Sequence, residues 1–165
     1  MQWSKTKARV EARFAPCVAG RVELRMTNYR HVRHSKGRGW ITIDGEEIHN
    51  FCSLRYEFEA YVFTTQMRYA GAPGDRQKAH ELLEEVEIVP QYWFEQSLQE
   101  YLSLSISDAL DSTNFLHRAL AMLDSRLGLR RLRQLDLGRE HHHLVHLFYR
   151  LRTAAEGLTP RPSAA

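Results

Sequence analysis

The chain has 165 residues, of which 43% are apolar and 26% are charged, and its formal net charge is +3. This length allows one hydrophobic core, and this composition excludes a disordered or fibrous chain. No apolar run approaches the roughly 20 residues of a membrane-spanning helix, and the first residues lack the apolar stretch of a secretory signal. We therefore expect a cytoplasmic protein with no membrane partner.

The charges are segregated along the chain. Residues 1–39 carry ten Lys and Arg against two Asp and Glu, residues 40–125 carry five against fifteen, and residues 126–165 carry eight against three. Two explanations are open. The basic ends come together as one face that meets an acidic partner, or they pack against the acidic middle and neutralise it.

The first segment predicts a helix followed by a strand. Ser4 is a favoured N-cap residue, and Gly20 suits the position just after a helix C-terminus. From Arg21 the pattern alternates, with Val22 and Leu24 on one side and charged residues on the other. This alternation is typical of a half-buried strand.

Two further strands are expected to form a hairpin. The apolar run at residues 40–43 leads into Asp44-Gly45, which is the strongest short hairpin signal. A third strand follows through Ile48 and Phe51.

Residues 53–69 predict an aromatic-rich helix with Ser53 as its N-cap. Its apolar residues recur at helical spacing, so we expect this helix to lie across the sheet and to cover it. These residues are Leu54, Phe58, Tyr61, Val62, Thr65 and Tyr69.

The remaining chain predicts four longer helices. They are expected at residues 75–88, 90–102, 115–127 and 139–157, with a short helical turn around residues 107–110. Within the second of them, Trp93 and Phe94 are expected in the core.

This order of elements indicates the α+β class. We expect a single α+β domain over residues 1–157, with an N-terminal helix, a three-stranded antiparallel sheet and a helical C-terminal half packed on the sheet. Residues 158–165 are rich in Pro, Ser and Ala and are expected to form a flexible tail. Cys17 and Cys52 lie among apolar neighbours, which favours buried thiols over a disulfide.

Three stretches of the sequence resemble a known family. They are MQWSK at the start, GRVELRMTNYR followed by GRGWITIDGEEI in the hairpin, and RALAMLDSRLGLRRL in the C-terminal half. Together they resemble a family of small, uncharacterised bacterial conserved hypothetical proteins, over most of the chain. The resemblance implies a bacterial cytosolic protein with one intact domain, and it implies no activity or catalytic residue.

Two basic segments are candidates for binding a polyanion. The first, residues 21–38, is expected to carry cations near a hairpin tip, and Tyr29 and Trp40 offer ring faces on which a base can stack. The second, residues 126–139, alternates arginines with leucines. The opposing explanation is that both segments are ordinary solvated surface. The predicted polyanion-binding residues are Arg25, Tyr29, Arg30, Arg33, Lys36, Arg38, Arg126, Arg130, Arg131 and Arg133.

A metal site receives little support from the sequence. His142 and His146 are four residues apart in a predicted helix, a spacing that can present two ligands to zinc. A complete site needs further ligands, and neither cysteine has a suitable neighbour, so we predict no metal and no other cofactor.

No complete catalytic motif is present either. The stretch HELLE at residues 80–84 has Glu84 where the zinc-protease pattern needs its second histidine, and the chain has no glycine-rich phosphate loop. We predict no catalytic residue, and the sequence leans away from an enzyme without excluding one.

These observations lead to two hypotheses for function. The leading one is a non-enzymatic binding domain whose partner is nucleic acid or another polyanion, bound through residues 21–38 and 126–139. The alternative is a protein-interaction module, such as an inhibitor or antitoxin-like subunit, that uses the acidic middle and the aromatic helix 53–69.

Overall fold

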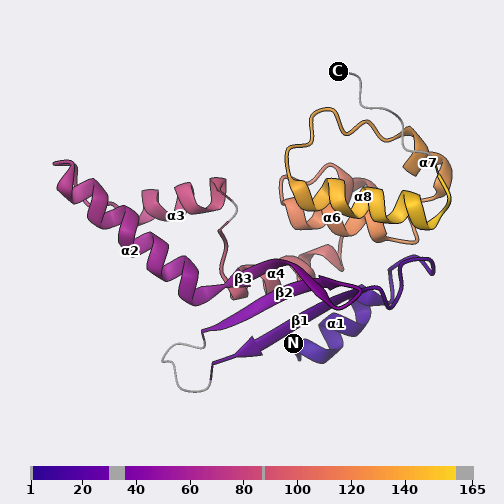
Figure 1. Cartoon of the computed structure of the whole chain (residues 1–165), viewed down its shortest axis with the longest axis horizontal. Coiled ribbons are helices and arrows are strands. Elements are labelled where there is room, and N and C mark those ends of the chain that lie inside the picture. Colours follow the sequence, from indigo (N-terminus) through magenta and orange to yellow (C-terminus); the bar gives the residue numbers. More distant parts are fainter. Residues whose placement is uncertain (1, 30–35, 87, 159–165) are drawn as a thin grey trace. The chain divides into compact units, whose positions relative to one another are not determined.

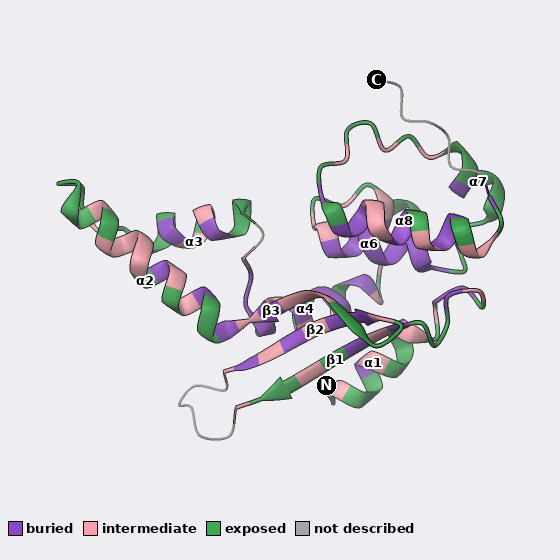
Figure 2. Cartoon of the chain, in the orientation of Figure 1, coloured by how far each residue is buried: buried purple, intermediate pink, exposed green. Residues whose placement is uncertain are grey.

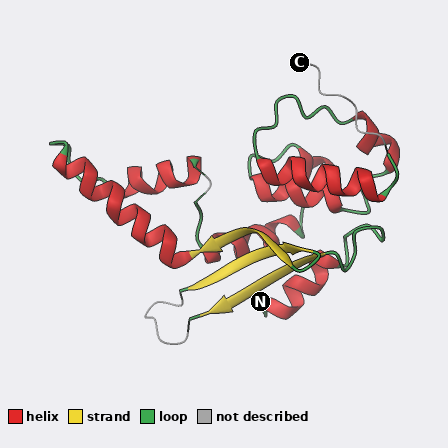
Figure 3. Ribbon diagram, in the orientation of Figure 1, coloured by secondary structure: helices red, strands yellow, loops and turns green. Residues whose placement is uncertain are grey.

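The structure is a computed structural model that describes residues 2–29, 36–86 and 88–158. Its fold is α+β, as predicted: an N-terminal helix, a three-stranded antiparallel sheet with strand order β1-β2-β3, and a helical C-terminal half (Figure 3). The elements are α1 (Trp3–Glu11), β1 (Val22–Asn28), β2 (Gly37–Ile43), β3 (Glu46–Cys52), α2 (Ser53–Tyr69), α3 (Arg76–Glu85), α4 (Gln91–Tyr101), α5 (Ile106–Leu110), α6 (Phe115–Leu123), α7 (Leu129–Gln134) and α8 (His143–Ala155). None of the described helices combines the length and the apolar character needed to span a bilayer.

The chain divides into two compact units. Unit 1 consists of Met1–Leu24, Thr42–Glu46 and Gln96–Ala165, and unit 2 consists of Arg25–Ile41 and Glu47–Glu95. The chain therefore passes between the units four times, and each of the three strands contributes residues to both. The expectation of a single domain stays a prediction.

Unit 1 is built around helices α6 and α8, which pack against each other (Figure 1). Helix α6 is buried on most of its surface because seven of its nine residues are buried. Its N-terminus is capped by Asn114, whose side chain accepts a hydrogen bond from the Leu116 N–H at 2.9 Å. Helix α5 also packs against α6.

Helices α1 and α6 end earlier than the sequence predicts, and for the same reason. Phe14 and Asp124 pair as an antiparallel bridge, with the Ala15 N–H donating to the Leu123 carbonyl and the Ser125 N–H donating to the Arg13 carbonyl, both at 2.7 Å. This pairing draws both segments into extended backbone, so α1 stops at Glu11 and α6 at Leu123. Helix α1 also begins earlier than predicted, because Gln2 rather than Ser4 is its N-cap.

The predicted hairpin turn between β2 and β3 is confirmed. Asp44 and Gly45 have φ angles of 52° and 87°, the left-handed values that a two-residue hairpin turn requires. The Asp44 carboxylate also forms a salt bridge with Arg21, with 2.6 Å between Oδ2 and Nη2.

In unit 2, the sheet is covered by α4 and not by α2, which corrects the prediction for residues 53–69. The Phe94 ring stacks on Phe51 with a centroid distance of 4.3 Å. It also lies against Gly39, where an added Cβ would come within 2.4 Å of the ring. Trp93, expected in the core, is only partly buried.

Helix α2 instead packs on α3, beside which it runs in Figure 1. Their shared core consists of Tyr56, Ala60 and Leu83, with Phe63 and Ile88 packed against it. Helix α3 begins at a capped N-terminus, where the Asp75 side chain accepts a hydrogen bond from the Lys78 N–H. Ser53 is the first residue of α2 and not its cap, which is Cys52.

Candidate functional site

The basic hairpin lies in unit 2 from Arg25 onward. Arg25 is exposed on β1, and Tyr29 and Lys36 are partly buried, joined by a hydrogen bond from the Tyr29 N–H to the Lys36 carbonyl at 2.8 Å. Arg30 and Arg33 lie outside the described residues.

Arg38 already has a charged partner within the chain. Its guanidinium forms an ion pair with Glu47 and lies over the Trp40 ring, 5.1 Å from the ring centroid. Trp40 is partly buried beneath it. A phosphate group would have to compete with Glu47 for Arg38, so this residue is a weak candidate for polyanion binding.

Arg126 binds groups in the interior of unit 1. It forms a salt bridge of 2.7 Å with Asp124, which is fully buried, and it donates to the Leu104 carbonyl at 3.0 Å. The Tyr101 hydroxyl donates to the same carboxylate at 2.5 Å. Arg126 therefore neutralises a buried charge, and the structure does not favour it as a binding residue.

The other three arginines of the second basic segment lie on the surface of α7. Arg130, Arg131 and Arg133 are all exposed, and the Arg131 guanidinium donates to the Ser107 hydroxyl at 2.9 Å. No described residue forms a salt bridge or side-chain hydrogen bond with Arg130 or Arg133. Segment 126–139 belongs to unit 1, whereas the hairpin from Arg25 belongs to unit 2. Their convergence on one face stays a prediction.

The two histidines considered as metal ligands have other roles. His142 is buried and caps α8, because its Nδ1 accepts a hydrogen bond from the Leu144 N–H at 3.1 Å. The His146 Nε2 lies 2.9 Å from the Glu140 carbonyl oxygen. Within residues 2–29, 36–86 and 88–158, no three His, Cys, Asp or Glu side chains are placed to share a metal ion.

Glu140 explains why α8 begins at His143 and not at the predicted Arg139. Its carboxylate binds Arg118 at 2.6 Å and accepts hydrogen bonds from the N–H groups of His141 and His142. Burial opposes ionisation of Glu140, but the bonds from Arg118 and the two N–H groups outweigh it and lower the pKa of the carboxyl.

The largest departure from the sequence analysis is the exposed apolar stripe of α2. We use this name for four residues that recur at helical spacing on the side of α2 that faces away from Tyr56 and Ala60. Leu54 is 41% exposed, Phe58 63%, Tyr61 69% and Tyr69 89%. Figure 2 shows α2 exposed along much of its length. Four of the six side chains predicted to cover the sheet are thus solvent-exposed.

A groove runs beside the apolar stripe, with a volume of about 300 Å³. Its walls include Tyr61 and Arg68 of α2 and Arg76 at the start of α3. Arg76 is paired with Glu57 at 2.8 Å, whereas the exposed Arg68 forms no salt bridge with any described residue. The groove therefore combines an aromatic wall with an arginine, Arg68, that pairs with no carboxylate of the described residues.

The cysteines are both free and partly buried. The Cys17 thiol lies 3.1 Å from the Glu156 carboxylate. Burial and this neighbouring carboxylate raise the pKa of Cys17, which keeps the thiol protonated and makes it a poor nucleophile.

Comparison with known proteins identifies a family and no individual relative. No curated protein and no solved structure matches the chain. A family model matches residues 2–153, which include the hairpin, α2 and the three α7 arginines. The chain therefore belongs to the SF0329 protein family.

Proposed function

We propose that this chain is a non-enzymatic protein-interaction module that binds its partner through the apolar stripe of α2. The observation that carries the proposal is the exposure of Phe58, Tyr61 and Tyr69 along one side of a single helix. Contiguous apolar surface of this kind is characteristic of interaction sites, because solvent exposure of aromatic side chains brings no benefit to a folded monomer.

The two faces of α2 differ in what they contact. Tyr56 and Ala60 are 2% exposed and supply the packing that holds α2 on α3. The apolar stripe is not needed for that packing. A long straight stripe with helical spacing suits a partner helix laid along it, with the aromatic side chains as anchors.

The partner's chemistry follows from the charge beside the apolar stripe. Arg68 is exposed at the edge of the groove and has no carboxylate partner among the described residues. We therefore expect an amphipathic helix with an acidic residue at the edge of its apolar face. The Arg68 guanidinium can bind that carboxylate through two parallel hydrogen bonds.

The test compares the parent chain with a double variant, Phe58→Ser with Tyr61→Ser, as bait in a bacterial lysate. Gln66→Ser, an exposed polar position on another side of α2, is the matched control. A partner retained by parent and control but not by the double variant is identified, purified and recombined with the chain. Its affinity should fall about tenfold or more in the double variant.

Two further measurements make the test decisive. Arg68→Glu should weaken the reconstituted complex, and replacing the partner's acidic residue by arginine should restore it. The proposal fails if reconstituted partners bind the double variant as tightly as the parent. It also fails if sedimentation shows that the stripe only mediates association between copies of this chain.

A second candidate function, binding of nucleic acid or another polyanion, is favoured by α7. Arg130 and Arg133 are exposed and have no acidic partner among the described residues, and within that same part of the chain the Arg131 guanidinium bonds to a serine hydroxyl alone. Three clustered guanidinium groups can neutralise phosphates and release their counterions. The hairpin cations Arg25 and Lys36 would extend this surface if the two basic segments converge.

This second function is tested by anisotropy with a labelled single-stranded oligonucleotide between low and physiological salt. Replacing Arg130, Arg131 and Arg133 by Gln should reduce the slope of log affinity against log salt by about two units, given ~0.7 unit per phosphate contact. The control replaces Lys5, Lys78 and Arg150, three exposed cations outside both segments, and changes the net charge equally.

The same assay tests the hairpin. Replacing Arg30, Arg33, Lys36 and Arg38 by Gln should weaken binding further if both segments contact one strand. Absence of binding at low salt, or equal losses in the control variant, would remove polyanion binding as a function.

A further inference from the structure

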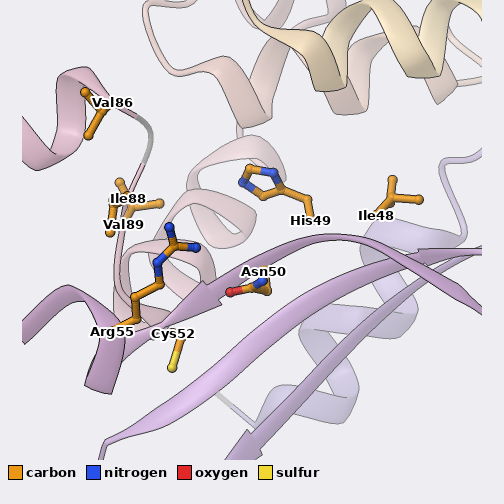
Figure 4. Close-up of a pocket in the computed structure, with 8 residues that line it drawn as sticks. All are labelled: Ile48, His49, Asn50, Cys52, Arg55, Val86, Ile88 and Val89. Atoms are coloured by element: carbon orange, nitrogen blue, oxygen red, sulfur yellow. The ribbon is translucent and has the colours of Figure 1, made fainter. Parts of the chain in front are cut away.

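A pocket of about 240 Å³ lies in unit 2, and none of the described residues that line it belongs to the apolar stripe or to the two basic segments. Three parts of the chain form it: strand β3, the first turn of α2, and the connection between α3 and α4. Figure 4 shows the lining side chains, which are Ile48, His49, Asn50, Cys52, Arg55, Val86, Ile88 and Val89. β3 is an edge strand of the sheet, so this flank is not covered by a further strand.

The polar part of the lining is suited to an anion. Figure 4 shows the Arg55 guanidinium projecting from the start of α2 toward the region between His49 and the connection at Ile88. Arg55 is exposed, and no described residue forms a salt bridge or hydrogen bond with its side chain. Asn50 adds an amide from β3, and none of the described lining residues is acidic.

The rest of the lining is aliphatic. Val86, Ile88 and Val89 line the side formed by the connection between α3 and α4, and Ile48 adds a fourth aliphatic side chain from β3. Val86 is 58% exposed, which is unusual for a valine beside a packed helix pair. The pocket thus pairs an arginine that no described residue neutralises with apolar walls that a ligand can cover.

We infer that this pocket binds a small organic carboxylate with an apolar body, held by Arg55. Guanidinium and carboxylate groups match in a two-hydrogen-bond geometry, and small-molecule sites typically combine apolar walls with a few polar groups that fix orientation. The volume has room for roughly eight water-sized groups, which limits the ligand to a short branched or single-ring acid. This site is independent of the proposed protein-interaction surface.

The experiment follows the methyl and amide resonances of the full chain by NMR during titration with matched probes. The probes are benzoate and 4-methylpentanoate, each paired with its neutral amide, and inorganic phosphate serves as an anion without an apolar body. We expect both carboxylates to shift the resonances of Ile48, Asn50, Val86 and Val89. The amides and phosphate should bind about tenfold more weakly or not at all.

Variants then assign the charge to one residue. Arg55→Met keeps much of the side-chain volume and should reduce carboxylate affinity about tenfold without affecting the weak amide binding. Arg150→Met, which removes an exposed arginine that does not line the pocket, should leave carboxylate binding unchanged. Unshifted amide spectra of both variants away from the substitution would show that the fold is intact.

Three results would overturn the inference. They are the absence of saturable shifts at the pocket with either carboxylate, equal affinity of the parent and Arg55→Met for the carboxylates, and phosphate binding as tight as carboxylate binding. The last result would mean that the site recognises charge alone and that the aliphatic walls contribute nothing to binding.

Discussion

Asp124 shows how one residue decides the local structure of unit 1. Its side chain is fully buried, which by itself opposes ionisation, but hydrogen bonds from Arg126 and Tyr101 outweigh that effect and lower the pKa of the carboxyl. Its backbone pairs with Phe14, and the same pairing ends both α1 and α6. Arg126 is thereby bound to the interior, which is why an arginine in a basic segment is not free to meet a phosphate.

His117 gives a prediction for the pH dependence of stability. It is buried, with its Nε2 2.9 Å from the Ser97 carbonyl oxygen, and burial lowers the pKa of the imidazole below its usual value. The unfolded chain therefore binds this proton more readily than the folded chain. The stabilisation from neutral His117 is complete above the unfolded pKa of about 6.5 and is lost as the pH falls below it.

The measurement is urea unfolding at several pH values between about 7.5 and 5.5. Below pH ~6.5, His117 contributes up to about 1.4 kcal/mol per pH unit to the loss of unfolding free energy. His117→Gln should have a shallower dependence than the parent, whereas His141→Gln, at an exposed position, should keep the parental one. Equal dependences in parent and His117→Gln would contradict the prediction.

For helix α2, the sequence predicts the position of the helix correctly but not the face that packs against the rest of the chain. The pattern predicts the helix at residues 53–69, and the structure has those bounds. It predicts the wrong face for packing, because apolar side chains occur on both, with Tyr56 and Phe63 on one and Phe58 and Tyr61 on the other. The choice depends on two other helices: α3 packs on Tyr56 and Ala60, and α4 places Phe94 on the sheet.

Other features follow the same rule: those that depend on neighbouring residues are predicted from the sequence, and those that depend on distant segments are not. The Asp44-Gly45 turn is local chemistry and is predicted correctly, as is the α+β order of elements. The pocket around Arg55 is assembled from three separate segments, and no spacing in the sequence brings Val86 beside Asn50. The sequence also does not predict that His142 caps α8, because histidine is not among the usual N-cap residues.

The orientation of α2 makes a testable prediction about stability. Tyr56→Ala removes a side chain that is 2% exposed and should cost roughly 3–5 kcal/mol of unfolding free energy. Phe58→Ala removes one that is 63% exposed and should cost less than about 0.5 kcal/mol. Both are measured by urea unfolding at fixed pH. If the two variants lose equal stability, the apolar stripe is packed within the chain and the proposed interaction surface does not exist.

The N-terminus of α8 makes a second prediction at this scale. His142→Ala should cost about 0.5–2 kcal/mol through loss of the cap, and His142→Asn should recover much of that loss because asparagine is a favoured cap. Treatment with a chelator should leave the thermal midpoint of the parent unchanged. A drop of several degrees that zinc reverses would show instead that the histidines bind metal.

At the scale of the whole molecule, the two units are linked through the sheet. β1 contributes Val22–Leu24 to unit 1 and its remaining residues to unit 2, and β2 and β3 are divided in the same way. Two units that are joined only by a flexible linker can unfold separately. Here, unfolding of one unit would break the strand pairing along part of each strand, which costs free energy in the other unit. We therefore expect the chain to be one folding unit.

We accordingly predict a single cooperative unfolding transition. Tryptophan fluorescence can follow each unit separately and test this prediction. Trp3 lies in unit 1, whereas Trp40 and Trp93 lie in unit 2. Trp3→Phe leaves fluorescence from unit 2 alone, and Trp40→Phe with Trp93→Phe leaves fluorescence from unit 1 alone. In urea, each variant's fluorescence midpoint should coincide with its own circular-dichroism midpoint, because both probes then follow the same two-state process. Fluorescence and circular-dichroism midpoints that differ by more than about 0.5 M urea within one variant would show that the units unfold independently.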